Sequence, residues 1–336
     1  MSRHLPSGTR TRAGRWALLA CLSAMAALPT ASRDSRIHIA PKFSVGEVFS
    51  YRIETHTTTT QHIVSPIVNP QGGSDYSQRF SLVVRLDVLD VQPAGQGAAA
   101  PVRFRVTYEK SHSESKSDAS DPTNPSPDGK YDSLEGRSLE FTLEPSGQLA
   151  DVKGLEDLFP NASLADPILS WLKVLSLDAA FPPGGVAIGQ KWTSEQPLTG
   201  SPLTGVLWRS QSTYLRDEPC AAAAAAANAP GGTQPPGGDT CAVVLTRLEI
   251  FRRGSAESDA TPEDYRRNGL RTSGTWAGSG ESLDSISLSS GLLISATETG
   301  TQNMDYQITS ASSGSRIHRD AHIRSQSEIT LIPATH

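Results

Sequence analysis

The sequence has few long apolar runs, few cysteines and no concentrated block of positive charge, and each shortage excludes a class of protein. Outside the N-terminal region, no stretch approaches the roughly 20 apolar residues that a membrane-spanning helix needs. The chain of 336 residues contains 30 lysine and arginine residues against 35 aspartate and glutamate residues. Because phosphate binding requires a basic face, no nucleic acid is expected as a partner.

The motifs of common hydrolases and nucleotide-binding proteins are also missing. No G-x-S-x-G elbow, phosphate-binding glycine loop or dinucleotide fingerprint occurs. Two S-x-x-K patterns, at 113–116 and 170–173, lack the companion motifs of serine acyl-enzymes. His318 and His322 would share one strand face about 13 Å apart, which is too far for one metal ion. The sequence therefore predicts no catalytic residue, no cofactor and no metal.

The first 31 residues have the features of a secretory signal. Four arginines and no acidic residue accompany an apolar run at 16–28, and small residues follow it. Without these arginines, 26 basic residues stand against 35 acidic ones, a net charge of −9. We expect a soluble, cleaved product in the periplasm or outside the cell. The alternative is a lipid anchor at Cys21, because residues 18–20 loosely resemble a lipoprotein cleavage box.

Only Cys220 and Cys241 remain in the mature chain. An even number of cysteines in an oxidising compartment predicts one disulfide. An alanine run and a Pro/Gly-rich stretch lie between them, and strand-like segments at 207–215 and 242–251 flank them. This arrangement predicts a hairpin with a long tip that is clipped at its base.

The composition and the apolar patterning favour β-structure. Serine, threonine and glycine are abundant, and long helical periods of Leu, Ala, Glu and Lys are nearly absent. The segments 83–91 and 103–108 alternate between apolar and polar residues, which is typical of strands with one buried face. Antiparallel sheets fit such alternation, whereas parallel sheets are buried on both faces. The long polar stretches 61–78, 111–136 and 252–273 are predicted as loops that lean toward disorder.

Two motifs recur at nearly the same offset, which predicts an internal duplication. Gly46 and Phe49 match Gly189 and Trp192, in a pattern of glycine followed three residues later by an aromatic residue and then a hydroxyl residue. The segment 138–149 matches 282–293, including a Ser-Gly-x-Leu hairpin. The glycines would supply turns and the aromatic residues would anchor strands in the core. The turn and anchor residues that we assign are Gly46, Phe49, Gly147, Gly189, Trp192 and Gly291.

These observations predict a mainly β protein built from two duplicated antiparallel units, as curved sheets or an open half-barrel. The signal would occupy 1–31, the first unit 32–153, a helical connector 154–180 and the second unit 181–336. Within the connector, Asp166 and Pro167 suit the start of an amphipathic helix that extends to about residue 177.

The signal, the glycine–aromatic turn and the Ser-Gly-x-Leu hairpin together resemble a broad group of uncharacterised secreted bacterial β-rich proteins. The segment 181–192, with its Gly189 and Trp192, and the approach Gly278–Asp284 carry this resemblance. The resemblance implies a fold and an exported location, but no activity.

Three functions are compatible with the sequence. The first is a non-catalytic envelope protein that shelters an apolar or lipid-like ligand in a concave sheet. The second is a structural or interaction module of the cell envelope without a small-molecule ligand. The third is a hydrolase whose residues converge only in the folded chain. Neither the partner nor the oligomeric state follows from the sequence.

Overall fold

A computed structural model of the chain describes residues 36–39, 42–65, 73–92, 100–117, 134–144, 149–158, 172, 181–182, 184–198, 201–220 and 239–332. The predicted signal at 1–31, Cys21 and most of the predicted connector lie outside these residues. Within the described part, no helix combines the length and the apolar content that crossing a bilayer requires.

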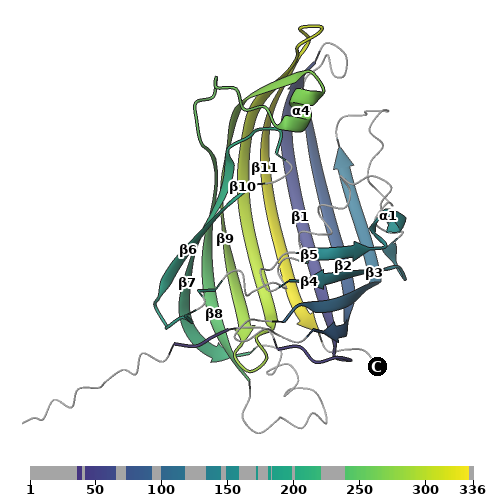
Figure 1. Cartoon of the computed structure of the whole chain (residues 1–336), viewed down its shortest axis with the longest axis vertical. Coiled ribbons are helices and arrows are strands. Elements are labelled where there is room, and N and C mark those ends of the chain that lie inside the picture. The colour runs from purple at the N-terminus through teal and green to yellow at the C-terminus, as the bar shows by residue number, and fades with distance from the viewer. Residues whose placement is uncertain are drawn as a thin grey trace, which may run out of the picture. The chain divides into compact units, whose positions relative to one another are not determined.

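The described residues form one antiparallel sheet of 11 strands (Figure 1). In chain order the strands are β1 (Val48–Val64), β2 (Gly73–Val91), β3 (Val102–Ser117), β4 (Ser138–Leu143), β5 (Leu149–Lys153), β6 (Lys191–Pro197), β7 (Val206–Pro219), β8 (Thr240–Arg252), β9 (Leu270–Ser287), β10 (Leu293–Ser310) and β11 (Arg316–Ile332). Their order in the sheet is β5-β4-β3-β2-β1-β11-β10-β9-β8-β7-β6. This arrangement confirms the predicted mainly β, open antiparallel fold.

The last strand joins the two halves of the sheet. Strand β11 pairs with β10 on one side and with β1 on the other, over 15 residue pairs in each case. The two units predicted from the sequence thus share one continuous sheet. The described residues include two short helices: α1 (Leu155–Leu158), between β5 and β6, and α4 (Glu263–Arg267), which was not predicted.

The two faces of the sheet differ in what covers them. Side chains alternate between the faces along each strand, and the register places Tyr51, Val84 and Leu331 on the same face. We call this the covered face, because Ile39, Leu158, Leu172 and Val186 from outside the strands pack into its main apolar cluster. In Figure 1, β4, β5 and α1 are drawn in front of this face. We call the opposite side the bare face.

The main apolar cluster fills one end of the covered face. Leu82 and Val84 are fully buried, and Phe104 lies between the rings of Phe43 and Phe141, with centroid distances of 5.0 and 5.4 Å. A second cluster lies toward the other end of β7–β11 and contains Leu203, Val206, Ile250, Ala260, Met304, Tyr306 and Ala321. These two clusters account for most of the buried apolar side chains.

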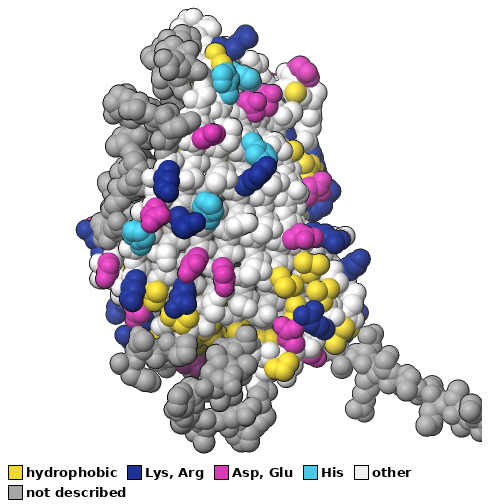
Figure 2. Space-filling view, turned by 180° about the vertical axis from the view of Figure 1, so that it is seen from behind, with side chains coloured by type: hydrophobic (Ala, Val, Ile, Leu, Met, Phe, Trp, Pro, Cys, Tyr) yellow, Lys and Arg dark blue, Asp and Glu magenta, His cyan; other side chains and the backbone are white. Residues whose placement is uncertain are grey.

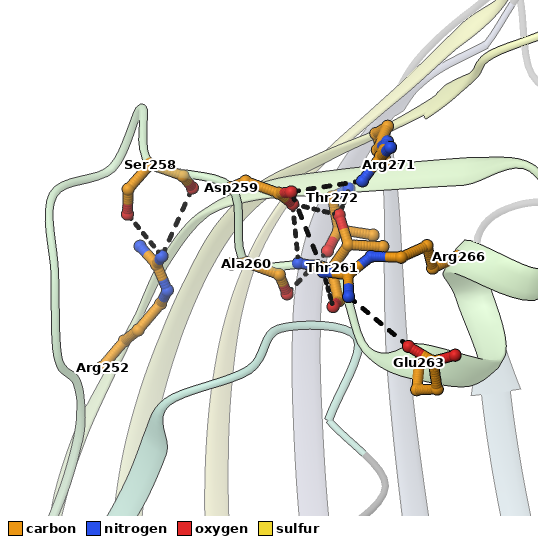
Figure 3. Close-up of polar contacts among 9 residues, drawn as sticks. All are labelled: Arg252, Ser258, Asp259, Ala260, Thr261, Glu263, Arg266, Arg271 and Thr272. Carbon is orange, nitrogen blue, oxygen red and sulfur yellow. Dashed lines mark hydrogen bonds and ion pairs between the residues drawn. The ribbon is translucent and has the colours of Figure 1, made fainter.

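The segment between β8 and β9 folds over the second cluster, although the sequence predicted a loose polar loop there. The Arg252 guanidinium donates hydrogen bonds to the carbonyl oxygens of Ser255 and Gly274 at 2.6 and 2.9 Å, and to Ser258 Oγ at 2.7 Å. Asp259 accepts hydrogen bonds from the backbone amide and the hydroxyl group of Thr261, and it forms an ion pair with Arg271 (Figure 3). Because polar partners satisfy the backbone, the segment can enclose Ala260 completely.

A second predicted loop is also shorter than expected. Strand β1 continues to Val64 and β2 begins at Gly73, so only the middle of 61–78 connects them. The threonine-rich end of β1 has the β-branched side chains that favour strands, and it pairs with both β2 and β11.

The predicted turns at Gly46 and Gly189 have the same hydrogen bonds. Their φ angles are 88° and 82°, in the region that only glycine adopts readily. The Gly46 amide donates to the Val88 carbonyl at 2.9 Å, and the Gly189 amide donates to the Tyr214 carbonyl at 2.6 Å. In both turns the next side chain accepts a hydrogen bond from the backbone amide three residues earlier. A β-bulge follows Val88 in β2 and Tyr214 in β7.

The two aromatic residues assigned as anchors each pack against a second ring. Phe49 lies edge-on to Phe43 with a centroid distance of 6.0 Å, and Trp192 lies against Phe181 at 5.3 Å. Both pack against the main cluster. Gly291, with a φ of 72°, lies in the turn between β9 and β10, while Gly147 is outside the described residues.

The predicted disulfide joins the adjacent ends of β7 and β8. Cys220 and Cys241 are bonded, with their Cα atoms 5.0 Å apart, and the Cys220 amide donates to the Asp239 carbonyl at 3.0 Å. The predicted clip at the base of this hairpin is confirmed. Such a bond fits an oxidising compartment outside the cytoplasm.

Candidate ligand-binding hollow on the bare face

The bare face is hollowed over the middle of the sheet. An open hollow of about 710 Å³ is lined by residues of β1, β8, β9, β10 and β11. Its lining consists of His56, Thr58, Arg247, Leu248, Ser279, Gly280, Glu281, Thr299, Gly300, Thr301, Arg324, Ser325 and Gln326. The strand register places nine of these side chains on the bare face, in two adjacent rows.

The backbone forms the floor of the hollow. Gly280 and Gly300 are direct partners in the β9–β10 register, and the side chains of Leu248 and Ser325 in the same row belong to the covered face. A Cβ atom at Gly280 would lie 2.6 Å from the Thr299 carbonyl oxygen, so β9 approaches β10 too closely there for any other residue.

The walls of the hollow are made of hydrogen-bonding groups. Ser279, Thr301, Arg324 and Thr58 form one row across four strands, and Glu281, Thr299, Gln326 and His56 form the next. Figure 2 shows the sheet from behind, with mainly uncharged polar surface over the middle, scattered charged and histidine side chains, and apolar groups near the lower margin. The lining therefore offers hydroxyl, amide, imidazole and guanidinium groups, together with the methyl and methylene groups of the side chains that carry them.

The charged groups of the lining differ in their partners. Arg247 forms an ion pair with Glu281, with an Nε–Oε1 distance of 3.0 Å. Arg324 Nε instead donates to Nε2 of His322 at 3.0 Å, and His322 Nδ1 lies 2.6 Å from Asn303 Oδ1. Within the described residues, neither His56 nor the terminal guanidinium nitrogens of Arg324 have a hydrogen bond or ion pair.

The histidines that we considered for metal binding have other partners. His318 Nε2 lies 2.8 Å from Asp305 Oδ1, while His322 contacts Asn303 and Arg324. No group of three or more His, Cys, Asp or Glu residues in the described ranges is arranged to hold a metal ion. His56 lies far from these histidines in the sequence, and only the strand register shows that it lines the hollow.

The two S-x-x-K patterns do not produce a nucleophile–base pair in the described part of the chain. Ser113 lies on the covered face of β3 and is buried, whereas Lys116 lies on the bare face and is exposed. Their side chains point to opposite sides of the sheet and cannot converge. The pattern at 170–173 lies outside the described residues.

A polar region also separates the two apolar clusters on the covered face. It includes Thr55, Thr57, Ser325 and Ser327, and it contains two carboxyl groups, those of Asp284 and Glu298. Burial raises the pKa of Asp284 to about 6; a 2.5 Å hydrogen bond from Ser282 Oγ opposes this rise, and the nearby Glu298 adds to it. Burial also raises the pKa of Glu298.

Comparisons with known proteins give no family. No family model matches the chain, and no curated protein matches it. Among solved structures, one that describes lipid–protein interactions in lipovitellin matches 88% of this chain with 11% identity and a TM-score of 0.34. The chain spans about a quarter, 26%, of that lipovitellin chain. The outer membrane protease OmpT from Escherichia coli matches 87% of this chain and 99% of its own, with 9% identity and a TM-score of 0.14. These TM-scores are too low for either similarity to bear on function.

Proposed function

We propose that the protein is an exported, non-catalytic binding protein of the cell envelope that holds a hydroxyl-rich ligand, a glycan, on the bare face of its sheet. The observation that carries this proposal is the open hollow, whose walls consist almost entirely of hydrogen-bonding side chains. The disulfide supports an exported location, because such bonds persist in oxidising compartments.

The chemistry of the lining favours a glycan over a protein partner. The core of a protein interface is apolar, and aromatic anchors dominate its binding energy. The walls of this hollow have no such apolar anchor. Leu248 is part of the lining, but its side chain points to the covered face and only its backbone faces the hollow. A ligand with many hydroxyl groups could instead exchange hydrogen bonds with the serine, threonine and glutamine side chains.

Affinity electrophoresis through gels that contain dextran or alginate tests this proposal. We expect wild-type protein to be retarded by at least one of the two polysaccharides. The double variant T58V/T301V removes two hydroxyl groups from the walls and keeps the shape of the side chains. It should bind roughly thirtyfold more weakly, at about 1 kcal/mol per hydrogen bond. The matched control is T275V, since Thr275 lies on the bare face of β9 outside the lining. Unretarded wild type in both gels, or equal retardation of all variants, would contradict the proposal.

The second candidate function is a carrier for an apolar or lipid-like ligand on the covered face. Trp208 and Trp276 pack against the second cluster but are only partly buried, so this side retains some accessible apolar surface. Native mass spectrometry of protein purified from its own envelope separates the two functions. A lipid-sized adduct that leaves on denaturation would support the carrier, and a clean mass would oppose it.

A further inference from the structure

We propose that the ligand of the hollow carries an anionic group, a carboxylate or a phosphate, and that Arg324 is the residue that binds it. This inference rests on the proposed function and specifies which glycans the site would take: acidic ones. It comes from a contrast between Arg324 and Arg247, the two arginines that line the hollow.

Several arginines on the bare face are already neutralised by a carboxylate. Arg85 pairs with Asp87, Arg103 and Arg105 pair with Glu140, and Arg209 pairs with Glu195 and Glu249, all at 3.2 Å or less. Inside the hollow, Arg247 is paired with Glu281 in the same way. Arg324 alone among the lining arginines has no carboxylate partner within the described residues, so its charge is available to a ligand.

The neighbours of Arg324 fix the direction of its guanidinium group. Arginine Nε can only donate a hydrogen bond, so His322 Nε2 must accept it at 3.0 Å. His322 Nδ1 then carries the proton and donates to Asn303 Oδ1 at 2.6 Å. These two hydrogen bonds engage the Nε atom of Arg324 and leave both of its terminal nitrogens free. Two parallel N–H groups are the arrangement that binds a carboxylate or phosphate at two points.

Further donors lie around this guanidinium group. Thr58 on β1 and Thr301 on β10 are the direct register partners of Arg324, one on each side. His56 and Gln326 occupy the next row of the hollow. Two exposed carboxylates, Glu54 and Glu328, face each other one row further along, outside the lining. They would repel an anion on that side and favour its placement beside Arg324.

Titration calorimetry with two tetrasaccharides tests the inference. The probes are tetragalacturonate, which carries carboxylates, and maltotetraose, which is neutral. We expect tetragalacturonate to bind at least tenfold more tightly than maltotetraose at low salt, and to lose much of that advantage in 0.5 M salt. R324Q should weaken tetragalacturonate binding by tenfold or more, because it removes a charge-assisted pair of hydrogen bonds. R324K should lose less, since it keeps the charge but not the two-point geometry.

The matched control is R52Q. Arg52 is an exposed residue on the bare face of β1, outside the lining, so the same loss of charge should change affinity less than twofold. Equal binding of both probes with no effect of R324Q would overturn the inference and leave the proposed function standing. Equal losses in R324Q and R52Q would also overturn it, because the effect would then come from net charge. If neither probe binds, both proposals fail.

Discussion

The covered face and the bare face of the sheet have the same strands but different chemistry. On the covered face, residues such as Leu82, Val84 and Val106 have no exposed surface, because segments outside the sheet pack against them. On the bare face, alternate residues of the same strands are hydroxyl, amide and charged groups around an open hollow. One face therefore stabilises the fold, while the other is free to vary and to bind.

Removal of a large side chain should distinguish the two faces most clearly. F104A deletes a buried ring between Phe43 and Phe141 and should lower the free energy of unfolding by about 3–5 kcal/mol. The control F251A deletes the same group on the bare face, where Phe251 is partly buried beneath the Arg209 guanidinium at 4.5 Å. It should cost about 1 kcal/mol. Urea denaturation measures both values, and equal losses would refute this assignment of the faces.

The disulfide marks the place where a bare-face side chain is fully enclosed. Cys241 lies on the bare side of β8, yet it and Cys220 are buried together with Ile294. The bond closes a loop across a sequence separation of 21 residues, which is worth about 3 kcal/mol in the loop-entropy description. C220A/C241A should lose about this much in urea denaturation. Reducing agent should shift the urea midpoint of the wild type to that of the variant and leave the midpoint of the variant unchanged. If the variant unfolds at the same urea concentration as the oxidised wild type, the expectation is contradicted.

The two halves of the sheet offer a second comparison, and it supports the proposed duplication. Gly46 and Gly189 donate equivalent hydrogen bonds, and the strand that accepts each bond has a bulge directly afterwards. Across the sheet, the strands of the first half follow in the order β5 to β1, and those of the second half follow in the order β10 to β6. Both halves are therefore crossed from their last strand to their first, and β11 lies between them. A duplicated chain whose last strand joins the first would have this order.

The features that local sequence could predict are those fixed by one strand or one turn. Alternation identified parts of β2 and β3, glycines located the turns, and two cysteines located the base of a hairpin. The pairing of β1 with β11 has no local signal, because it depends on which distant strand completes the sheet. The hollow was missed for the same reason: His56, Thr301 and Arg324 lie on three strands and meet only through the register.

The smallest expected difference between the faces concerns charge. Because burial raises the pKa of Asp284 from an ordinary value of 3.8 to about 6, the folded state holds this proton more tightly than the unfolded state. Its contribution to stability is complete below about pH 4 and is lost as the pH rises through 6. Each pKa unit corresponds to about 1.4 kcal/mol of free energy. Because the side chain is partly exposed, solvent screening reduces the value that the pKa difference implies, and the buried charge should cost about 2 kcal/mol of stability at pH 7.5. D284N should therefore stabilise the protein by about this amount at pH 7.5 and by little at pH 3.5.

The control D320N makes the same change at an exposed position on the bare face of β11 and should stay within about 0.5 kcal/mol at both pH values. Urea denaturation at each pH measures the four differences. A gain for D284N that is equal at both pH values would show that the covered face tolerates the carboxylate, and that the two faces differ in packing alone.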